Sequence, residues 1–194
     1  MIKSTFYVGL LFFVTAFTGK AYAQDRTQNG RTGGLPSRDG FWLSLAGGGA
    51  VGQTKFANLT GAVAYEFKKK PTLVTLRCAY NLGLFEEESL TPLIKVGDVG
   101  LLYGYKVGKF RFSAGVGAVW GTDRGAYKYY VSDPLLYGNN VYESLDYTTI
   151  GLPTEIRFIT GGKDLAIGLT AFGNVNAKRS FFGLNLAFYL GELK

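Results

Sequence analysis

The sequence predicts an all-β fold, an eight-stranded antiparallel up-and-down transmembrane β-barrel preceded by a cleaved signal peptide. Three observations support this fold class. Apolar and polar residues alternate in eight segments, the links between the segments differ in length in a regular way, and charged residues keep to one face of each segment. Alternation with a period of two residues is the pattern of a strand with one face in apolar surroundings.

The stretch from Lys109 to Gly121 shows this alternation most clearly. Its even-numbered residues, from Phe110 to Trp120, are all apolar, and the residues between them are charged, polar or small, or in one case Val119. The stretch also has about the length of a tilted membrane-crossing strand, roughly 9–11 residues. The eight predicted strands cover about 41–52, 56–67, 72–83, 96–107, 109–121, 148–160, 164–174 and 181–191.

The other seven strands repeat the pattern, each with one apolar face. In the first four strands this face carries Phe41, Leu43, Leu45 and Val51, then Leu59, Val63, Tyr65 and Phe67, then Val74, Leu76, Cys78, Tyr80 and Leu82, then Val99, Leu101, Tyr103, Tyr105 and Val107. In the last three it carries Ile150, Leu152, Ile156 and Phe158, then Leu165, Ile167, Leu169 and Ala171, then Phe182, Leu184, Leu186, Phe188 and Leu190.

The links indicate how the strands are oriented. Residues 68–71, 108–109 and 161–163 form short links, whereas 84–95 and 122–147 form long ones. Outer-membrane barrels have short periplasmic turns and longer extracellular loops. The short links are therefore predicted to face the periplasm and the two long links the cell exterior.

Charged residues within the strands lie on the polar face, opposite the apolar one. They are Glu66, Arg77, Asp98, Lys106, Arg111, Glu155 and Arg157. A soluble barrel with this polar face outward would be a lipocalin-like periplasmic binding protein, which is one alternative. Lipid around the apolar face is the better interpretation, because the charges then point into the barrel. Closure follows, since an open sheet edge in hydrocarbon leaves backbone groups unpaired.

With these features, residues 41–194 resemble the small eight-stranded outer-membrane β-barrel proteins of Gram-negative bacteria, such as outer-membrane protein X and the opacity-like proteins of the porin family. The resemblance implies an outer-membrane location, contact with outer-membrane lipid and lipopolysaccharide, insertion by the barrel-assembly machinery, and a monomer. The family's insertion signal ends in an aromatic residue. Here the last aromatic residue, Tyr189, lies several residues before the end.

The N-terminal region is predicted to be a signal peptide over residues 1–23. Lys3 precedes an apolar core, and Ala21-Tyr22-Ala23 is a small-x-small cleavage site, so cleavage is expected after Ala23. A retained N-terminal anchor is the alternative. Residues 24–39 are expected to form a flexible periplasmic lead-in and residues 40–194 the barrel domain.

The seven inward charges are the first candidate site, a barrel-interior charge network. An eight-stranded barrel is only wide enough for side chains to fill. Three acids among four bases therefore favour a salt-bridged plug. The alternative is a narrow pore or transporter for small solutes or ions, since many inward residues are Gly or Ala.

The long link 122–147 is the second candidate site because it is rich in tyrosine. The candidate surface-recognition residues are Tyr127, Tyr129, Tyr130, Tyr137 and Tyr142. Tyrosine provides a large contact area at low entropic cost. Packing of these rings on the barrel rim is the alternative. Lys178 and Arg179, in the last external link, could meet lipopolysaccharide phosphates.

Other functional classes find little support in the sequence. It contains no histidine, so a non-enzymatic protein is expected. One cysteine, Cys78, forms neither an internal disulfide nor a metal cluster. The glycines at 47–52 match a dinucleotide pattern, but no helix-forming segment follows, so no cofactor is expected. Without Lys3 and Lys20 of the predicted signal peptide, the net charge of +7 falls to about +5, which is too small to indicate nucleic acid. The expected role is structural or surface-binding, through links 84–95 and 122–147, with an unknown ligand.

Overall fold

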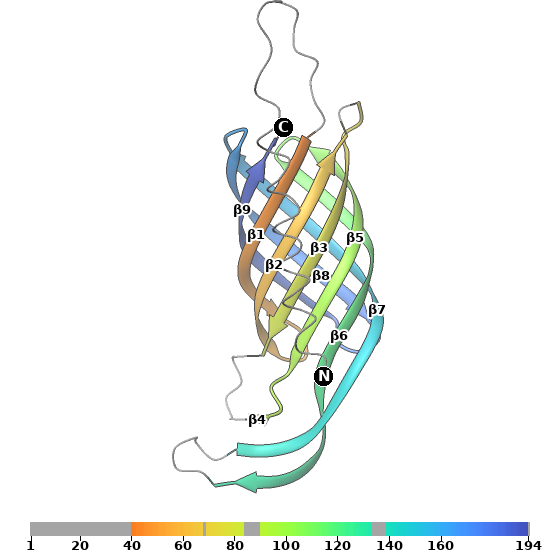
Figure 1. Ribbon diagram of the computed structural model, residues 1–194, viewed down its shortest axis with the longest axis vertical. Helices are drawn as coiled ribbons and strands as arrows, with labels where there is room; N and C mark the ends of the chain where they lie inside the picture. The colour runs from red at the N-terminus through yellow and green to blue at the C-terminus, as the bar shows by residue number, and fades with distance from the viewer. Residues whose placement is uncertain (1–39, 68, 84–89, 133–138, 194) are drawn as a thin grey trace, which may run out of the picture. The chain divides into compact units, whose positions relative to one another are not determined.

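The computed structural model describes residues 40–67, 69–83, 90–132 and 139–193. The predicted signal peptide and lead-in lie outside these residues. The strands are β1 (Gly40–Val51), β2 (Lys55–Glu66), β3 (Thr72–Leu82), β4 (Leu90–Thr91), β5 (Lys95–Val107), β6 (Phe110–Val131), β7 (Asn139–Gly161), β8 (Leu165–Asn176) and β9 (Phe181–Gly191). Figure 1 shows them arranged around a barrel.

Eight strands form a closed antiparallel ring. Going round it, β1 pairs with β2, then β3, β5, β6, β7, β8 and β9 follow, and β9 pairs with β1 from Gly191↔Trp42 to Phe182↔Val51. The two-residue strand β4 is an addition, parallel to β7. The predicted all-β, eight-stranded antiparallel up-and-down barrel and its eight predicted strands are thus confirmed. No helix in the described part of the chain is long and apolar enough to span a membrane.

The prediction of a long loop at 122–147 is wrong for the residues that the structure describes. Strands β6 and β7 run on past the barrel and pair from Thr122↔Asp146 to Val131↔Asn139, with irregularities between Arg124 and Tyr129. Tyr and Val favour strands, which explains the extension. We call residues 122–131 and 139–147 the outer ribbon. It projects beyond the rest of the barrel at the bottom of Figure 1.

The link 84–95 is also partly ordered into strands. Leu90 and Thr91 form β4, which pairs with Asn140 and Val141 of the outer ribbon, and β5 begins at Lys95. Residues 84–89 lie outside the described residues. The base of the outer ribbon is tied to this link, because Arg124 Nε donates a hydrogen bond to the carbonyl oxygen of Pro92 at 2.9 Å.

The two faces of the barrel wall differ as the alternation predicts. Large apolar side chains are exposed on the outside, for example Leu101, Ile150 and Leu186. Polar and charged side chains are buried inside, for example Arg77 and Asp98. The barrel is therefore apolar outside and polar inside, which is the arrangement of a membrane-spanning β-barrel.

Candidate functional site

All seven predicted residues of the interior charge network are found inside the barrel. Glu66 comes from β2, Arg77 from β3, Asp98 and Lys106 from β5, Arg111 from β6, and Glu155 and Arg157 from β7. Six are buried, and only the side chain of Lys106 is partly exposed, at 21%. Five strands thus contribute to the network, which forms two groups.

The first group lies near the short turns. The carboxylate of Glu66 accepts hydrogen bonds from Trp42 Nε1 at 2.9 Å and Arg111 Nε at 2.5 Å through Oε1, and from Lys106 Nζ at 3.2 Å through Oε2. Lys106 and Arg111 are cross-strand partners, which brings both cations to the same carboxylate. One acid therefore holds two bases.

The second group lies deeper in the barrel and is balanced in charge. Arg77 donates to Asp98 Oδ1 from Nε at 3.2 Å and Nη2 at 2.6 Å, and its Nη1 lies 3.5 Å from Glu155 Oε1. Arg157 Nη2 donates to the other oxygen of Glu155. The guanidinium of Arg157 also lies 4.9 Å from the centre of the Trp42 ring. Buried charges need such pairing, because an isolated one costs several kcal/mol.

A neutral polar group lies further along the interior, and sequence reasoning did not identify it as a unit. Asn58 Nδ2 donates to Asn81 Oδ1 at 2.8 Å, while Asn58 Oδ1 accepts from Asn185 Nδ2 at 2.5 Å and from Thr60 Oγ1 at 2.8 Å. These residues do lie on the polar faces of their predicted strands. Periodicity places them inside but does not show that β2, β3 and β9 bring them together.

Two apolar clusters occupy the interior at opposite ends. The turn-end cluster contains Trp42, Ala46, Ala64, Leu73, Ile159, Ala166, Ala187, Tyr189 and Leu193. The ribbon-end cluster contains Ala50, Phe56, Ile94, Val96, Val119, Phe172 and Phe181. Ile94 enters it from the link before β5. The alternation places several of these residues inward, for example Ala50, Ala64 and Tyr189, but the sequence analysis expected a small and polar inward face and did not predict apolar clusters at its two ends.

Two of the inward glycines lie close to other side chains. A Cβ atom at Gly100 would lie 2.8 Å from Cγ of Pro153, and one at Gly104 would lie 2.3 Å from Oγ of Ser113. The space beside both glycines is therefore already filled by other side chains. Among the residues that the structure describes, no group of three His, Cys, Asp or Glu could hold a metal ion.

At the ribbon end, an ion pair joins the outer ribbon to the link between β8 and β9. Arg179 donates to both carboxylate oxygens of Asp123, to Oδ2 from Nε at 3.1 Å and to Oδ1 from Nη2 at 2.5 Å. Burial raises the pKa of Asp123, but the hydrogen bonds from Arg179 and the Arg124 N–H outweigh it and hold this pKa below its usual value. Arg179 is thus engaged within the protein, whereas Lys178 is exposed.

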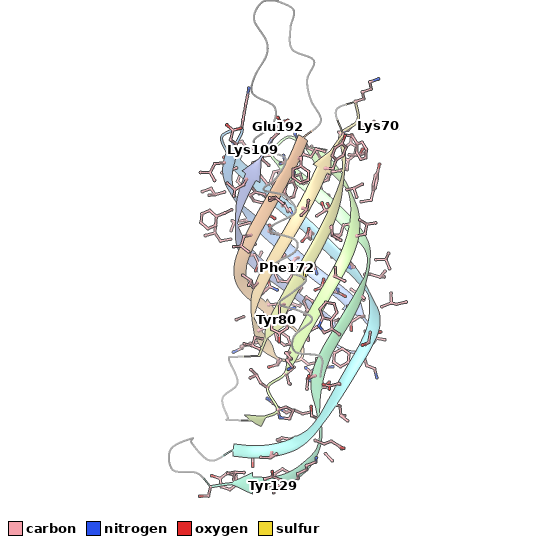
Figure 2. The ribbon with its side chains drawn as sticks, in the orientation of Figure 1. Lys70, Tyr80, Lys109, Tyr129, Phe172 and Glu192 are labelled. Atoms are coloured by element: carbon pink, nitrogen blue, oxygen red, sulfur yellow. The ribbon has the colours of Figure 1, made fainter. Side chains whose placement is uncertain are left out.

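Four of the five predicted recognition tyrosines are described, and all four lie on the outer ribbon. Tyr127, Tyr129 and Tyr130 are more than half exposed. Tyr142 is partly buried and meets Tyr127 edge to face, with 5.7 Å between ring centres. Tyr137 lies outside the described residues. Figure 2 shows Tyr129 on the ribbon, at the opposite end of the barrel from Lys70 and Lys109.

Comparison with known proteins places the fold. No protein-family model matches the chain, and no curated protein matches its sequence. The crystal structure of Ail, the attachment invasion locus protein of Yersinia pestis, is similar at a TM-score of 0.50 and 12% identity, covering 79% of this chain and 97% of that one.

Two further solved structures give slightly lower scores. The N-terminal β-barrel domain of Pseudomonas aeruginosa OprF has a TM-score of 0.48 and 8% identity, covering 77% of this chain and 96% of that one. Neisserial surface protein A has a TM-score of 0.46 and 7% identity, covering 78% and 96%. Together with the closed ring of eight strands, the similarity to Ail confirms that the chain has the fold of the small eight-stranded outer-membrane β-barrels.

Proposed function

We propose that this protein is a non-enzymatic integral outer-membrane barrel with a sealed interior, which acts at the cell surface through its outer ribbon. The observation that carries the proposal is the outer ribbon itself. It extends the barrel wall past the rim as paired strands and exposes Tyr127, Tyr129 and Tyr130.

Membrane insertion is supported by the apolar outer surface. Exposed Leu, Ile, Val, Phe and Tyr side chains occur on all eight strands of the ring, while the residues of the interior charge network lie inside. A soluble protein rarely exposes apolar patches of more than a few hundred Å². A lipocalin-like binding barrel would have the opposite arrangement. Lipid and lipopolysaccharide are therefore the surroundings that fit this wall.

A sealed interior is supported by three layers of side chains. The turn-end cluster, the paired charges and the ribbon-end cluster succeed one another along the barrel. This succession favours the plug over the narrow pore.

The absence of histidine from the whole sequence supports a non-enzymatic role, as does the engagement of Glu66, Asp98 and Glu155 in ion pairs.

A recognition role is supported by the strand pairing of the outer ribbon. Strand pairing fixes the positions of its side chains, so binding orders fewer groups than it would on an unpaired loop. Large amphipathic rings on such a support are typical of protein surfaces that bind partners.

The test is a triple variant, Y127S/Y129S/Y130S, displayed on cells and assayed for attachment to surfaces coated with collagen, mucin or a sulfated polysaccharide. We expect attachment to be lost while the barrel keeps its heat-modifiable gel mobility. A matched control, Y65S/Y103S/Y105S, removes three exposed tyrosines from the barrel wall. Attachment that survives in the ribbon variant, or falls equally in the control, would contradict the recognition role.

A further inference from the structure

Within the outer ribbon, strand β6 carries two extra residues relative to β7. Four successive pairs along the ribbon are Arg124↔Ser144, Tyr127↔Tyr142, Tyr129↔Val141 and Tyr130↔Asn140. Between the first and second pairs, and again between the second and third, β6 advances by one residue more than β7. Such an extra residue is a β-bulge, which bends a strand and re-aims its side chains. Figure 1 shows both strands curving together beyond the barrel.

The bulges decide which tyrosines share a face of the ribbon. Paired residues lie on the same face of a sheet, as do residues two apart on a regular strand. Because β7 has no extra residue here, Tyr142 and Asn140 lie on one face. Their partners Tyr127 and Tyr130 therefore lie on that face too, whereas Tyr129 lies on the opposite face. In an unbulged strand, Tyr127 and Tyr129 would have shared a face.

Two side-chain contacts agree with this assignment. The rings of Tyr127 and Tyr142 meet edge to face, with 5.7 Å between their centres. On the other face, a Cβ atom at Gly125 would lie 3.1 Å from both Cβ of Glu143 and Cδ1 of Leu145. We call the side that carries three tyrosines the tyrosine face, and its residues are Tyr127, Tyr130, Tyr142 and Asn140.

The tyrosine face continues the outer side of the barrel wall, but it lies well past the rim. The pair Trp120↔Thr148 lies near the ribbon end of the wall, since β5 pairs with β6 only as far as Thr122. Tyr142 is on the same face of β7 as Thr148 and six residues earlier, which is about 20 Å along a strand. Contact with the hydrocarbon core does not account for exposed rings at this distance.

The paired residues of this face favour an uncharged ligand. Among the described residues paired along it, from Arg124↔Ser144 to Tyr130↔Asn140, the one charged side chain is that of Arg124. Its Nε donates to the carbonyl oxygen of Pro92 at 2.9 Å. The face presents aromatic rings, their hydroxyls and one amide. Tyrosine and asparagine side chains supply hydrogen-bond donors to a ligand without requiring it to carry charge.

A proline-rich segment in the polyproline II conformation matches these groups. Its backbone makes no internal hydrogen bonds and proline has no N–H, so it presents many carbonyl acceptors and few donors. Proline-rich segments bind to surfaces lined with aromatic residues. The spacing agrees as well. Two residues of a strand, the step from Tyr142 to Asn140, span about 6.6 Å, and two residues of polyproline II span about 6.2 Å.

We propose that the tyrosine face binds a proline-rich segment of a partner protein in the polyproline II conformation. Tyr127, Tyr130 and Tyr142 stack on its prolines, and the Asn140 amide donates to a backbone carbonyl. This inference rests on the proposed function, because the outer ribbon meets such a partner only at the cell surface. It goes further by naming the class of ligand and by excluding Tyr129 from the site.

The experiment measures binding of fluorescein-labelled decaproline to the barrel in lipid nanodiscs, followed by fluorescence anisotropy. A glycine-serine peptide of the same length and the uncharged glycan maltoheptaose are tested in parallel. We expect saturable binding of decaproline and much weaker binding of the other two. Tyr127→Ser and Tyr130→Ser should each lower the affinity for decaproline about tenfold, the usual effect of truncating a tyrosine at the centre of an interface.

Tyr129→Ser is the matched control. It makes the same change on the same strand, and Tyr129 is exposed to the same degree, at 56% against 55% for Tyr127 and 57% for Tyr130. Because its side chain lies on the other face, affinity should stay within about twofold. Tyr130→Phe keeps the ring and should lose less affinity than Tyr130→Ser. Heat-modifiable gel mobility checks that each variant still forms the barrel.

Three results would overturn the inference. These are equal effects of the Ser substitutions at 129 and 130, equal binding of decaproline and the glycine-serine peptide, and tighter binding of maltoheptaose than of decaproline. Failure of the proposed function is distinguishable, because it appears as unchanged cell attachment in the triple variant Y127S/Y129S/Y130S. Attachment that is lost in that variant, from a parent protein that does not bind decaproline, contradicts only the proline-rich ligand.

Discussion

Removing Arg77 should destabilise the barrel more than any other single change in the interior charge network. Its side chain is completely buried and bonds Asp98, whose own side chain is 1% exposed. Arg77→Ala leaves Asp98 without its cationic partner, whereas Glu155 keeps Arg157. Breaking a buried pair in this way typically costs about 3–5 kcal/mol. Loss of the guanidinium 5.9 Å from the Phe172 ring adds to this.

A second substitution separates the stranded charge from the lost packing. Asp98→Asn in the Arg77→Ala background removes the carboxylate charge and keeps the side-chain shape. We expect the double variant to recover about 2 kcal/mol or more, so that the two changes are strongly non-additive. The assay is equilibrium unfolding in urea in lipid vesicles, followed by the fluorescence of Trp42 and Trp120.

Exposed Lys55 provides the control, since Lys55→Ala should change the free energy of unfolding by less than about 0.5 kcal/mol. A cost below about 1 kcal/mol for Arg77→Ala would refute the assignment of a dry, paired interior. The assignment would also be refuted if the double variant lost as much free energy of unfolding as the two single variants together. In that case Arg77 would not stabilise the Asp98 carboxylate.

Three further predictions concern other parts of the barrel. Because the pKa of Asp123 is lowered in the folded state, its pairing with Arg179 should stabilise the ribbon end fully above the usual aspartate pKa. This stabilisation should be lost as the pH falls towards the lowered value, and hydrogen exchange in the β8–β9 link should then rise to the level of Asp123→Asn. Gly48→Ala should cost more than about 1 kcal/mol, because its Cβ would lie 2.1 Å from the Leu184 carbonyl oxygen, whereas Gly47→Ala, with 3.9 Å to the nearest atom, should be tolerated. In planar bilayers the protein should give no steady current, and an ohmic current that changes in Arg77→Ala would favour the pore.

The eight strands could be predicted because lipid would impose one requirement on every outward side chain. From Phe110 to Trp120 each second residue must be apolar, and the resulting pattern fixes which face Arg111 occupies. Beyond Thr122 this requirement ends, because both faces of the outer ribbon lie outside the barrel wall. The alternation disappears there although the strands continue, and Tyr129 or Val141 is then equally compatible with a loop.

The contents of the interior were harder to predict than its polarity. A period of two residues places Val119 and Phe172 inward but does not show that they meet Phe56 and Ile94 at one end of the barrel. Arg179 presents the same difficulty, since its partner Asp123 is 56 residues away in the sequence. Contacts of this kind depend on the stagger between strands, which one strand's pattern does not contain.

The interior charge network supplies the register that the outer face leaves open. A slip of two residues between β3 and β5 would keep every apolar residue outward, because the side-chain period is two. It would, however, move Asp98 away from Arg77. In the observed register, Asp98 lies opposite Ala79 and Arg77 lies opposite Gly100. We infer that these ion pairs select one register rather than add stability. The Arg77→Ala/Asp98→Asn variant tests this inference: it should fold stably yet show doubled amide resonances along β3, and a single set of resonances would contradict it.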